Sequence, residues 1–246
     1  MNTLLAFAFL FAIGSLSGWI IEVFFRHWFS SSNPQHKWVN PGFCVGPYLP
    51  IYGFGLCALF ILAYISDEYN MFASAKSIIL WFITMTLVMT LIEYIAGLIS
   101  IKVMHVKLWD YSDMWGNIQG IICPLFSLFW AILGAIYLFF IHPYIYQALL
   151  WLKGNLAFSF FVGFFFGIFI IDVIYSSHLV SIIKKFADEN QVVVRLEKLK
   201  AEVIHLKEIR QEKSKFFFPL SSSYRSLNEY LNEVKDNISG LINHKD

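Results

Sequence analysis

The sequence predicts an all-α membrane protein, a polytopic bundle of about five transmembrane helices followed by a helical tail. Hydrophobic residues make up 58% of the 246 residues and charged residues only 14%, whereas soluble domains average ~45–50% and ~25%. The apolar residues gather in runs that reach the ~20 residues a bilayer span requires. After Ser177 the composition becomes charged and amphipathic. We therefore predict a transmembrane domain over 1–177 and a cytoplasmic amphipathic tail over 178–246.

Five apolar windows are long enough to span a bilayer. They are Leu4–Phe25, Phe43–Ile65, Ser77–Ile101, Gly120–Ile141 and Asn155–Ser176. The second window opens with several glycines and prolines, so its first turns are expected to be broken or re-entrant. The segment His142–Leu152 is short and aromatic, which favours a position at the membrane interface.

The distribution of basic residues predicts the orientation in the cell membrane. Lysines and arginines fall mainly in alternate loops, on the side of the lysine-rich tail: Arg26, Lys37, Lys102 and Lys107, against Lys76 and Lys153 on the other side. We therefore predict an outside N-terminus and a cytoplasmic tail. The chain begins Met-Asn-Thr, without a charged n-region, so a first span is favoured over a cleavable signal peptide.

Several function classes find no support in the sequence. The net charge of +1 gives no argument for nucleic-acid binding. The three cysteines form no C-x-x-C motif and no two histidines have i, i+4 spacing, so neither a metal centre nor a cofactor is predicted. There is also no Walker motif or G-x-S-x-G elbow, so the chain alone is not expected to hydrolyse ATP in the P-loop manner.

Three of the predicted spans carry a lone carboxylate among aliphatic residues near their C-terminal ends: Glu22, Glu93 and Asp172. Alternate spans run in the same direction, so all three are expected in the cytoplasmic half of the membrane. The even-numbered spans echo one another at their starts, Asn40–Pro47 against Asn117–Pro124. These echoes indicate either parallel structural repeats or a coincidence of short motifs.

A carboxylate inside a bilayer costs ~2.5–3.5 kcal/mol at the centre and less near the interface, so it normally faces a partner or a cavity. Arg26 lies one turn after Glu22, at ion-pair spacing, and both could instead snorkel to the interface. Asp110, Tyr111 and Asn117 could line a cavity mouth or belong to an interfacial aromatic belt. Our predicted substrate-binding residues are Glu22, Glu93, Asp172, Asn40, Tyr48, Asp110, Tyr111 and Asn117.

Glycine stripes and the tail provide candidate packing surfaces. Gly14 and Gly18 share a helix face with Glu22, and Gly163 and Gly167 form a second small-xxx-small pattern. In the tail, apolar residues with 4-3-4-3 spacing predict a helix that packs on the protein itself or on a partner: Val192, Leu196, Leu199, Val203 and Leu206. Phe216–Pro219 interrupts this pattern and suggests a dip into the membrane interface. A last amphipathic helix is expected from Leu227, ending near Gly240.

Several ordered blocks resemble the CmpB-like ABC-transporter permease family of bacterial membrane proteins: Gly18–Glu22, Asn40–Gly55, Leu91–Gly97, Trp109–Ser112 and Asn117–Trp130. The resemblance covers roughly residues 1–180. It implies a permease that works with a separate ATP-binding subunit, and it carries Glu22, Asn40, Glu93, Asp110, Tyr111 and Asn117 over as motif positions. Pro41 and Ile121 stand where the family pattern has basic residues, so an anion-binding role of those positions does not carry over.

These observations favour a membrane-transport component, a permease-like subunit with a cytoplasm-facing polar cavity lined by intramembrane carboxylates. An intramembrane enzyme acting on a lipid or isoprenoid headgroup is the alternative, with the carboxylates and Tyr111 as acid–base groups. A non-catalytic scaffold or regulator is the third. The expected partners are the lipid bilayer, a separate ATP-binding subunit, and a second copy bound through the glycine stripes or the tail.

Overall fold

The protein is a helical membrane protein, and its described residues contain five helical segments long and apolar enough to span a bilayer. The computed structural model describes residues 2–30, 33–69, 74–190, 192–221, 225–237 and 242–244. The candidate spans are Thr3–Trp28, Pro50–Glu68, Lys76–Lys102, Pro124–Gly154 and Leu156–Glu189. They correspond to helices α1 (Thr3–Trp28), α2 (Pro50–Glu68), α3 (Ala75–Lys102), α4 (Pro124–Ile136) with α5 (His142–Gly154), and α6 (Ser159–Glu189). The predicted fold class is confirmed.

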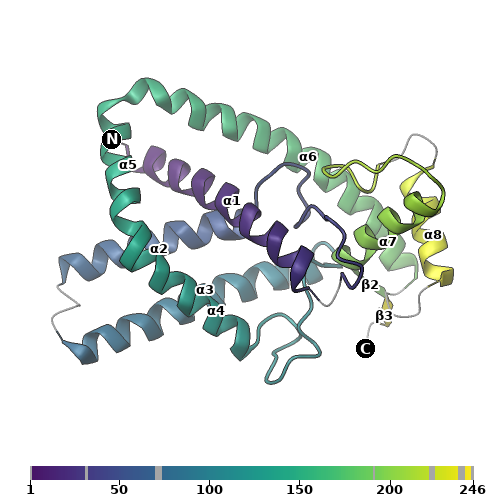
Figure 1. The fold of residues 1–246 in the computed structure, drawn as a ribbon, viewed down its shortest axis with the longest axis horizontal. Coiled ribbons are helices and arrows are strands. Elements are labelled where there is room, and N and C mark those ends of the chain that lie inside the picture. The colour runs from purple at the N-terminus through teal and green to yellow at the C-terminus, as the bar shows by residue number, and fades with distance from the viewer. Residues whose placement is uncertain are drawn as a thin grey trace. The chain divides into compact units, whose positions relative to one another are not determined.

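The fourth span is longer than predicted because the helix does not stop at Ile141. Helix α4 (Pro124–Ile136) passes through a π-helical turn, η1 (Tyr137–Ile141), into α5 (His142–Gly154) (Figure 1). In this turn the amide of His142 donates to the carbonyl of Tyr137, five residues back. Pro143 follows and has no amide hydrogen to donate, which fits a local change of hydrogen-bond register here. His142–Leu152 therefore continues the helix instead of forming a separate segment. A short 3₁₀ turn, η2 (Leu156–Phe158), then leads into α6.

Helix α2 begins at Pro50, later than the predicted window from Phe43, and the first residues of that window are non-helical, as expected from their glycines and prolines. Residues 38–49, which we call the Asn40 loop, contain no helix. Gly42 adopts φ +71°, a left-handed conformation that glycine accepts without steric cost. The loop therefore presents its backbone N–H and C=O groups to other elements, and each buried group requires a partner.

The chain divides into two compact units that interleave along the sequence. Unit 1 contains residues 1–16, 50–96 and 111–168. Its core is built from apolar side chains of the spans, among them Leu10, Leu59, Met85, Trp130 and Leu149. Gly14 lets α1 approach α2 closely, since a Cβ there would lie 2.7 Å from the carbonyl oxygen of Tyr52.

Unit 2 contains residues 17–49, 97–110 and 169–246. The tail contributes α7 (Leu196–Ile209) and α8 (Leu227–Asn237), which pack on each other. It also contributes to a small sheet of order β1-β2-β3. In this sheet β1 (Val106–Lys107) runs parallel to β2 (Val192–Arg195), and β2 runs antiparallel to β3 (Ile242–His244).

The tail differs from its prediction where the helical seam begins. Val192 belongs to β2 instead of a helical seam, because Val192-Val-Val-Arg195 is a β-branched run with alternating burial. Helix α7 then carries the seam from Leu196 to Leu206. The predicted stop at Gly240 lies outside the described residues. Helix α6 runs through Ser177 to Glu189 as one helix, so the domain boundary at Ser177 stays a prediction.

Candidate functional site

The Asn40 loop is organised by the side chain of Asn40, which is 1% exposed. Its Oδ1 accepts a hydrogen bond from the indole N–H of Trp19 on α1, at 2.7 Å. Its Nδ2 donates to the carbonyls of Cys44 and Val45, at 3.2 and 2.7 Å. Asn40 therefore closes the loop on itself and ties it to the first span, so its polar groups are used structurally.

Asp172 of α6 binds the far end of the same loop. Its carboxylate accepts hydrogen bonds from the amides of Val45 and Gly46, at 3.1 and 2.6 Å, and from the hydroxyl of Tyr48. The Ser176 hydroxyl donates to it as well, at 2.7 Å. Burial raises the pKa of Tyr48, and the hydrogen bond to Asp172 raises it further. The phenol therefore stays protonated and serves as a donor to the carboxylate.

A tail residue, Lys200 of α7, holds the middle of the loop. Its ammonium donates to the carbonyls of Asn40 and Gly42, at 2.9 and 2.8 Å, and the side chain is 5% exposed. Burial, with the nearby charge of Arg26, lowers the pKa of Lys200 to about 7. The loop is thus bound by residues of α1, α6 and α7 that all belong to unit 2.

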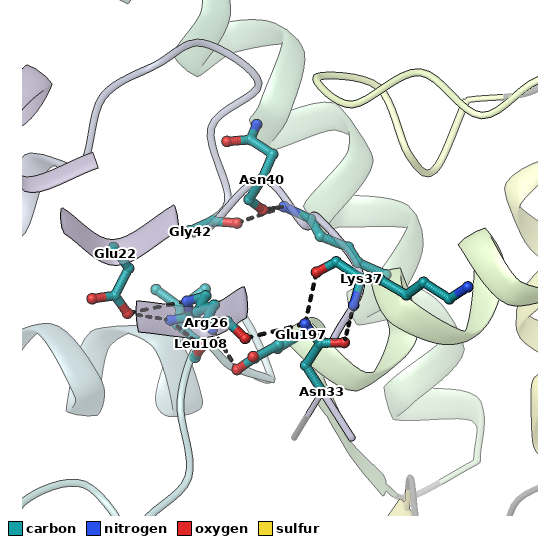
Figure 2. Close-up of polar contacts among 9 residues, drawn as sticks. Glu22, Arg26, Asn33, Lys37, Asn40, Gly42, Leu108 and Glu197 are labelled. Carbon is teal, nitrogen blue, oxygen red and sulfur yellow. Dashed lines mark hydrogen bonds and ion pairs between the residues drawn. The ribbon is translucent and has the colours of Figure 1, made fainter. Parts of the chain in front are cut away.

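Arg26, at the end of α1, is the centre of a buried ion-pair network (Figure 2). Its guanidinium lies 2.9 Å from Glu22 on its own helix and 2.5 Å from Glu197 of α7. It also donates to the carbonyl of Leu108, at 3.4 Å. The predicted Glu22–Arg26 pair is present, and Glu197 completes it. Arg26, Asn40, Glu197 and Lys200 also line a small pocket.

Asp110 joins a second ion-pair group in unit 2. Its carboxylate lies 2.6 Å from the guanidinium of Arg195 on β2 and 3.2 Å from the ammonium of Lys107 on β1. Because these two strands pair in parallel, Asp110 neutralises a cation from each. Its contacts therefore secure the tail sheet.

Glu93 has its own set of partners in unit 1. The carboxylate accepts hydrogen bonds from the Tyr111 hydroxyl and from the indole N–H of Trp130, each at 3.0 Å. Tyr111 stacks on Phe126 with ring centroids 4.1 Å apart. Glu93 is 3% exposed, so the donors replace water around it. This resembles Asp172, since each carboxylate accepts from a tyrosine in the loop before an even-numbered span.

Asn117 builds a turn, like its counterpart Asn40. Its Nδ2 donates to the carbonyls of Ser112 and Met114, and its Oδ1 accepts from the amide of Gly120, at 3.1, 2.9 and 3.0 Å. Both asparagines thus organise the loop that precedes a helix beginning with proline. The similar sequences of the two loops therefore correspond to a similar structural role of their asparagines.

Residues 9–177 match the model of the family described as "Putative ABC-transporter type IV". The chain belongs to this family. No curated protein and no solved structure matches it. The family match includes every predicted site residue, from Glu22 to Asp172, and ends before the tail.

Two residues that complete the site lie beyond the region shared with the family, namely Glu197 and Lys200. They are not predictable from the sequence, because charged residues between the apolar positions of an amphipathic helix usually face water. In α7, Glu197, Lys200 and Lys207 are 8%, 5% and 0% exposed. No sequence pattern distinguishes them from Lys198 or Glu202, since burial here depends on what packs around the helix.

The eight predicted residues divide between the units. Five lie in unit 2: Glu22, Asn40, Tyr48, Asp110 and Asp172. Three lie in unit 1: Glu93, Tyr111 and Asn117. Each carboxylate has hydrogen-bonding partners within its own unit. A common cavity for Glu22, Glu93 and Asp172 stays a prediction. Among the described residues no group of three or more His, Cys, Asp or Glu is arranged to hold a metal ion.

Proposed function

We propose that the chain is the permease-like membrane subunit of an ABC-type transport system. The observation that supports this most is the Asn40 loop, an irregular stretch of backbone directly before a candidate span. Side chains of α1, α6 and α7 satisfy its polar groups. Irregular backbone at the start of a span is typical of transporter binding sites, where it is tolerated because it lines a cavity or is buried in protein.

In this proposal Glu22, Tyr48 and Asp172 of unit 2 bind a polar solute beside the Asn40 loop. Asp172 and Glu22 supply acceptors, Tyr48 supplies a hydroxyl, and the pocket lined by Arg26 and Lys200 supplies cations. Substrate binding would exchange some of these internal contacts for contacts with the solute. Because the loop leads directly into α2, a change in the contacts of the loop would change the position of the first turn of that helix. Glu93, Tyr111 and Asn117 would have the corresponding role in unit 1.

A separate ATP-binding subunit would supply the energy, since the sequence contains no Walker motif. The test is to purify the full chain, with a C-terminal tag, from its native membranes in mild detergent. We expect a P-loop protein to co-purify in a fixed ratio and the complex to hydrolyse ATP. A chain that purifies without any nucleotide-binding subunit would overturn the ABC-type assignment. Conversion of a lipid by the purified chain without nucleotide would support the enzyme alternative instead.

The role of Asp172 can be tested in the same complex. Asp172→Asn keeps the shape of the side chain but replaces a charged acceptor of two amides and a phenol. We expect ATP hydrolysis by the complex to fall at least tenfold, as for the loss of ~1.4 kcal/mol or more of a functional interaction. Asp188→Asn is a matched control on the same helix, where Asp188 pairs with His105 and is 45% exposed. Equal activity of the two variants would exclude a functional role of Asp172.

A further inference from the structure

A short aromatic segment of the tail presents its rings on the surface beside two basic residues. Phe217 and Phe218 are 38% and 40% exposed. Lys213 and Lys215, just before them, are exposed as well. Basic residues next to aromatic rings are typical of protein surfaces that bind the interface of an anionic membrane.

The backbone that follows the exposed rings is fixed by buried hydrogen bonds to α7. Lys207 of α7 donates to the carbonyls of Pro219 and Ser221, at 2.6 and 2.7 Å. Pro219 and Leu220 are buried, and Lys207 is 0% exposed. The buried clamp fixes the backbone directly after the rings.

The rings contact two candidate spans within unit 2. Phe217 stacks on Trp19 of α1 with ring centroids 6.0 Å apart, and Phe218 meets Tyr175 of α6 edge-on at 6.0 Å. Trp19 and Tyr175 each lie sixteen residues beyond the first residue of their helix, which is about 24 Å along the axis. A hydrocarbon core is about 30 Å thick. For helices that begin at the opposite edge of this core, these positions lie near its other edge, where aromatic belts form.

The neighbouring surface of α6 is apolar and exposed. Ile171 and Ile174, next to Tyr175 on this helix, are 70% and 67% exposed. Such large exposed aliphatic side chains on a candidate span are expected to contact lipid chains. The aromatic segment thus continues a lipid-facing surface into the tail, and its lysines add the charge that anionic headgroups attract.

We propose that Phe216–Phe218 is a membrane-interface anchor, in which Phe217 and Phe218 insert among lipids and Lys213 and Lys215 bind anionic headgroups. The proposal depends on the membrane location of the chain and not on its transport activity. Phe217 and Phe218 also line a pocket together with Cys44 and Lys200. The lipid surface would therefore fix the part of the tail that faces the Asn40 loop.

Spin labels in the full chain, reconstituted in vesicles, test the anchor. Labels are placed singly at Phe217→Cys, Phe218→Cys and Asn228→Cys, in a background where Cys44, Cys57 and Cys123 are serine and thermal unfolding resembles that of the native chain. Asn228 is an exposed control on α8 of the same tail. We expect labels at 217 and 218 to collide several-fold more with oxygen than with a water-soluble nickel chelate. The label at 228 should show the reverse.

A second comparison tests the lysines. In vesicles with a quarter phosphatidylglycerol, the oxygen preference at 217 should exceed that in pure phosphatidylcholine. Lys213→Gln combined with Lys215→Gln should remove this difference. Labels at 217 and 218 that behave like the label at 228 in both vesicles would overturn the anchor. Labels shielded from both reagents would also overturn it, because protein would then cover the rings.

Discussion

Arg26 shows what a charge at the end of an apolar helix requires. The side chain is 6% exposed, and an unpaired charge at that depth would be strongly unfavourable. Glu22 lies on the same helix and is visible in the sequence, but one carboxylate leaves much of the guanidinium fork without acceptors. Glu197 and the Leu108 carbonyl supply more of them. At the residue scale, the charge of Arg26 is therefore balanced by groups from α1, from α7 and from the segment after β1.

Removing Glu197 should be far more costly than removing a similar residue on the same helix. Glu197→Gln leaves Arg26 buried with one carboxylate fewer, and breaking a buried pair costs about 3–5 kcal/mol. Glu208 is the ion-pair partner of Lys37, and its side chain is 48% exposed. Glu208→Gln should therefore lower the free energy of unfolding by less than about 1 kcal/mol. Unfolding of both variants in detergent measures the difference. Equal stability of the two would show that the Arg26 network is not stabilising.

The stability of unit 2 should rise with pH between about 7 and 9. The pKa of Lys200 is lowered to about 7 in the folded chain by burial and Arg26, although Cys44, Glu197 and Asp172 raise it. Above pH 7 the unfolded chain therefore binds a proton that the folded chain does not, so raising the pH favours folding. Above about pH 9 the trend should weaken, because burial raises the pKa of Cys44 to about 12 and the unfolded thiol then ionises first.

Lys200→Met removes the titrating group and provides the control for this pH dependence. Its unfolding free energy should rise less steeply than that of the native chain from pH 7 to 9. Some slope should remain, since burial also lowers the pKa of Lys207. Identical slopes for the native chain and the variant would contradict the assignment to Lys200.

At the scale of elements, the two glycine stripes of the sequence have different surroundings. A Cβ at Gly14 would lie 2.7 Å from the Tyr52 carbonyl and 2.8 Å from the Leu56 Cβ, both on α2. At Gly163 and Gly167, on α6, a Cβ would meet nothing within 4 Å. Gly14 of the first stripe is thus used for packing within unit 1. Self-association through the second stripe or the tail stays a prediction.

Alanine substitutions at the two stripes should have different effects on stability. Gly14→Ala forces α1 and α2 apart and should destabilise the chain by about 1–3 kcal/mol, as overpacking does. Gly163→Ala should be neutral or stabilise by about 0.5–1 kcal/mol, because alanine favours helix over glycine. Thermal unfolding in detergent compares them. A marked loss of stability in Gly163→Ala would indicate that a second copy covers this face.

At the scale of the whole molecule, the tail is a structural part of unit 2. Its strand β2 pairs with β1, and α7 binds both Arg26 and the Asn40 loop. This explains why unit 2 combines residues 17–49 with the chain after Phe169. The tail therefore stabilises polar groups of the Asn40 loop.

Truncation of the tail should open the Asn40 loop without preventing membrane insertion. A chain that ends after Glu189 keeps all five candidate spans but loses Glu197 and Lys200. We expect limited proteolysis of the membranes to cleave within residues 29–49 much faster than in the full chain. Lys200→Met should show a smaller increase at the same sites. Equal protection of the truncated chain would contradict a structural role of the tail.

The sequence by itself determined the membrane class, the approximate spans and the family. The spans are readable because the thickness of a bilayer fixes how many consecutive apolar residues a helix needs to cross it. It also identified Glu22, Glu93 and Asp172 as costly groups in need of partners. The partners were decided by tertiary structure. Lys200 reaches the carbonyls of Asn40 and Gly42 from far along the chain, and burial of a charge depends on which elements surround it. No local pattern records those surroundings, so the tail residues of the site became visible only in the folded chain.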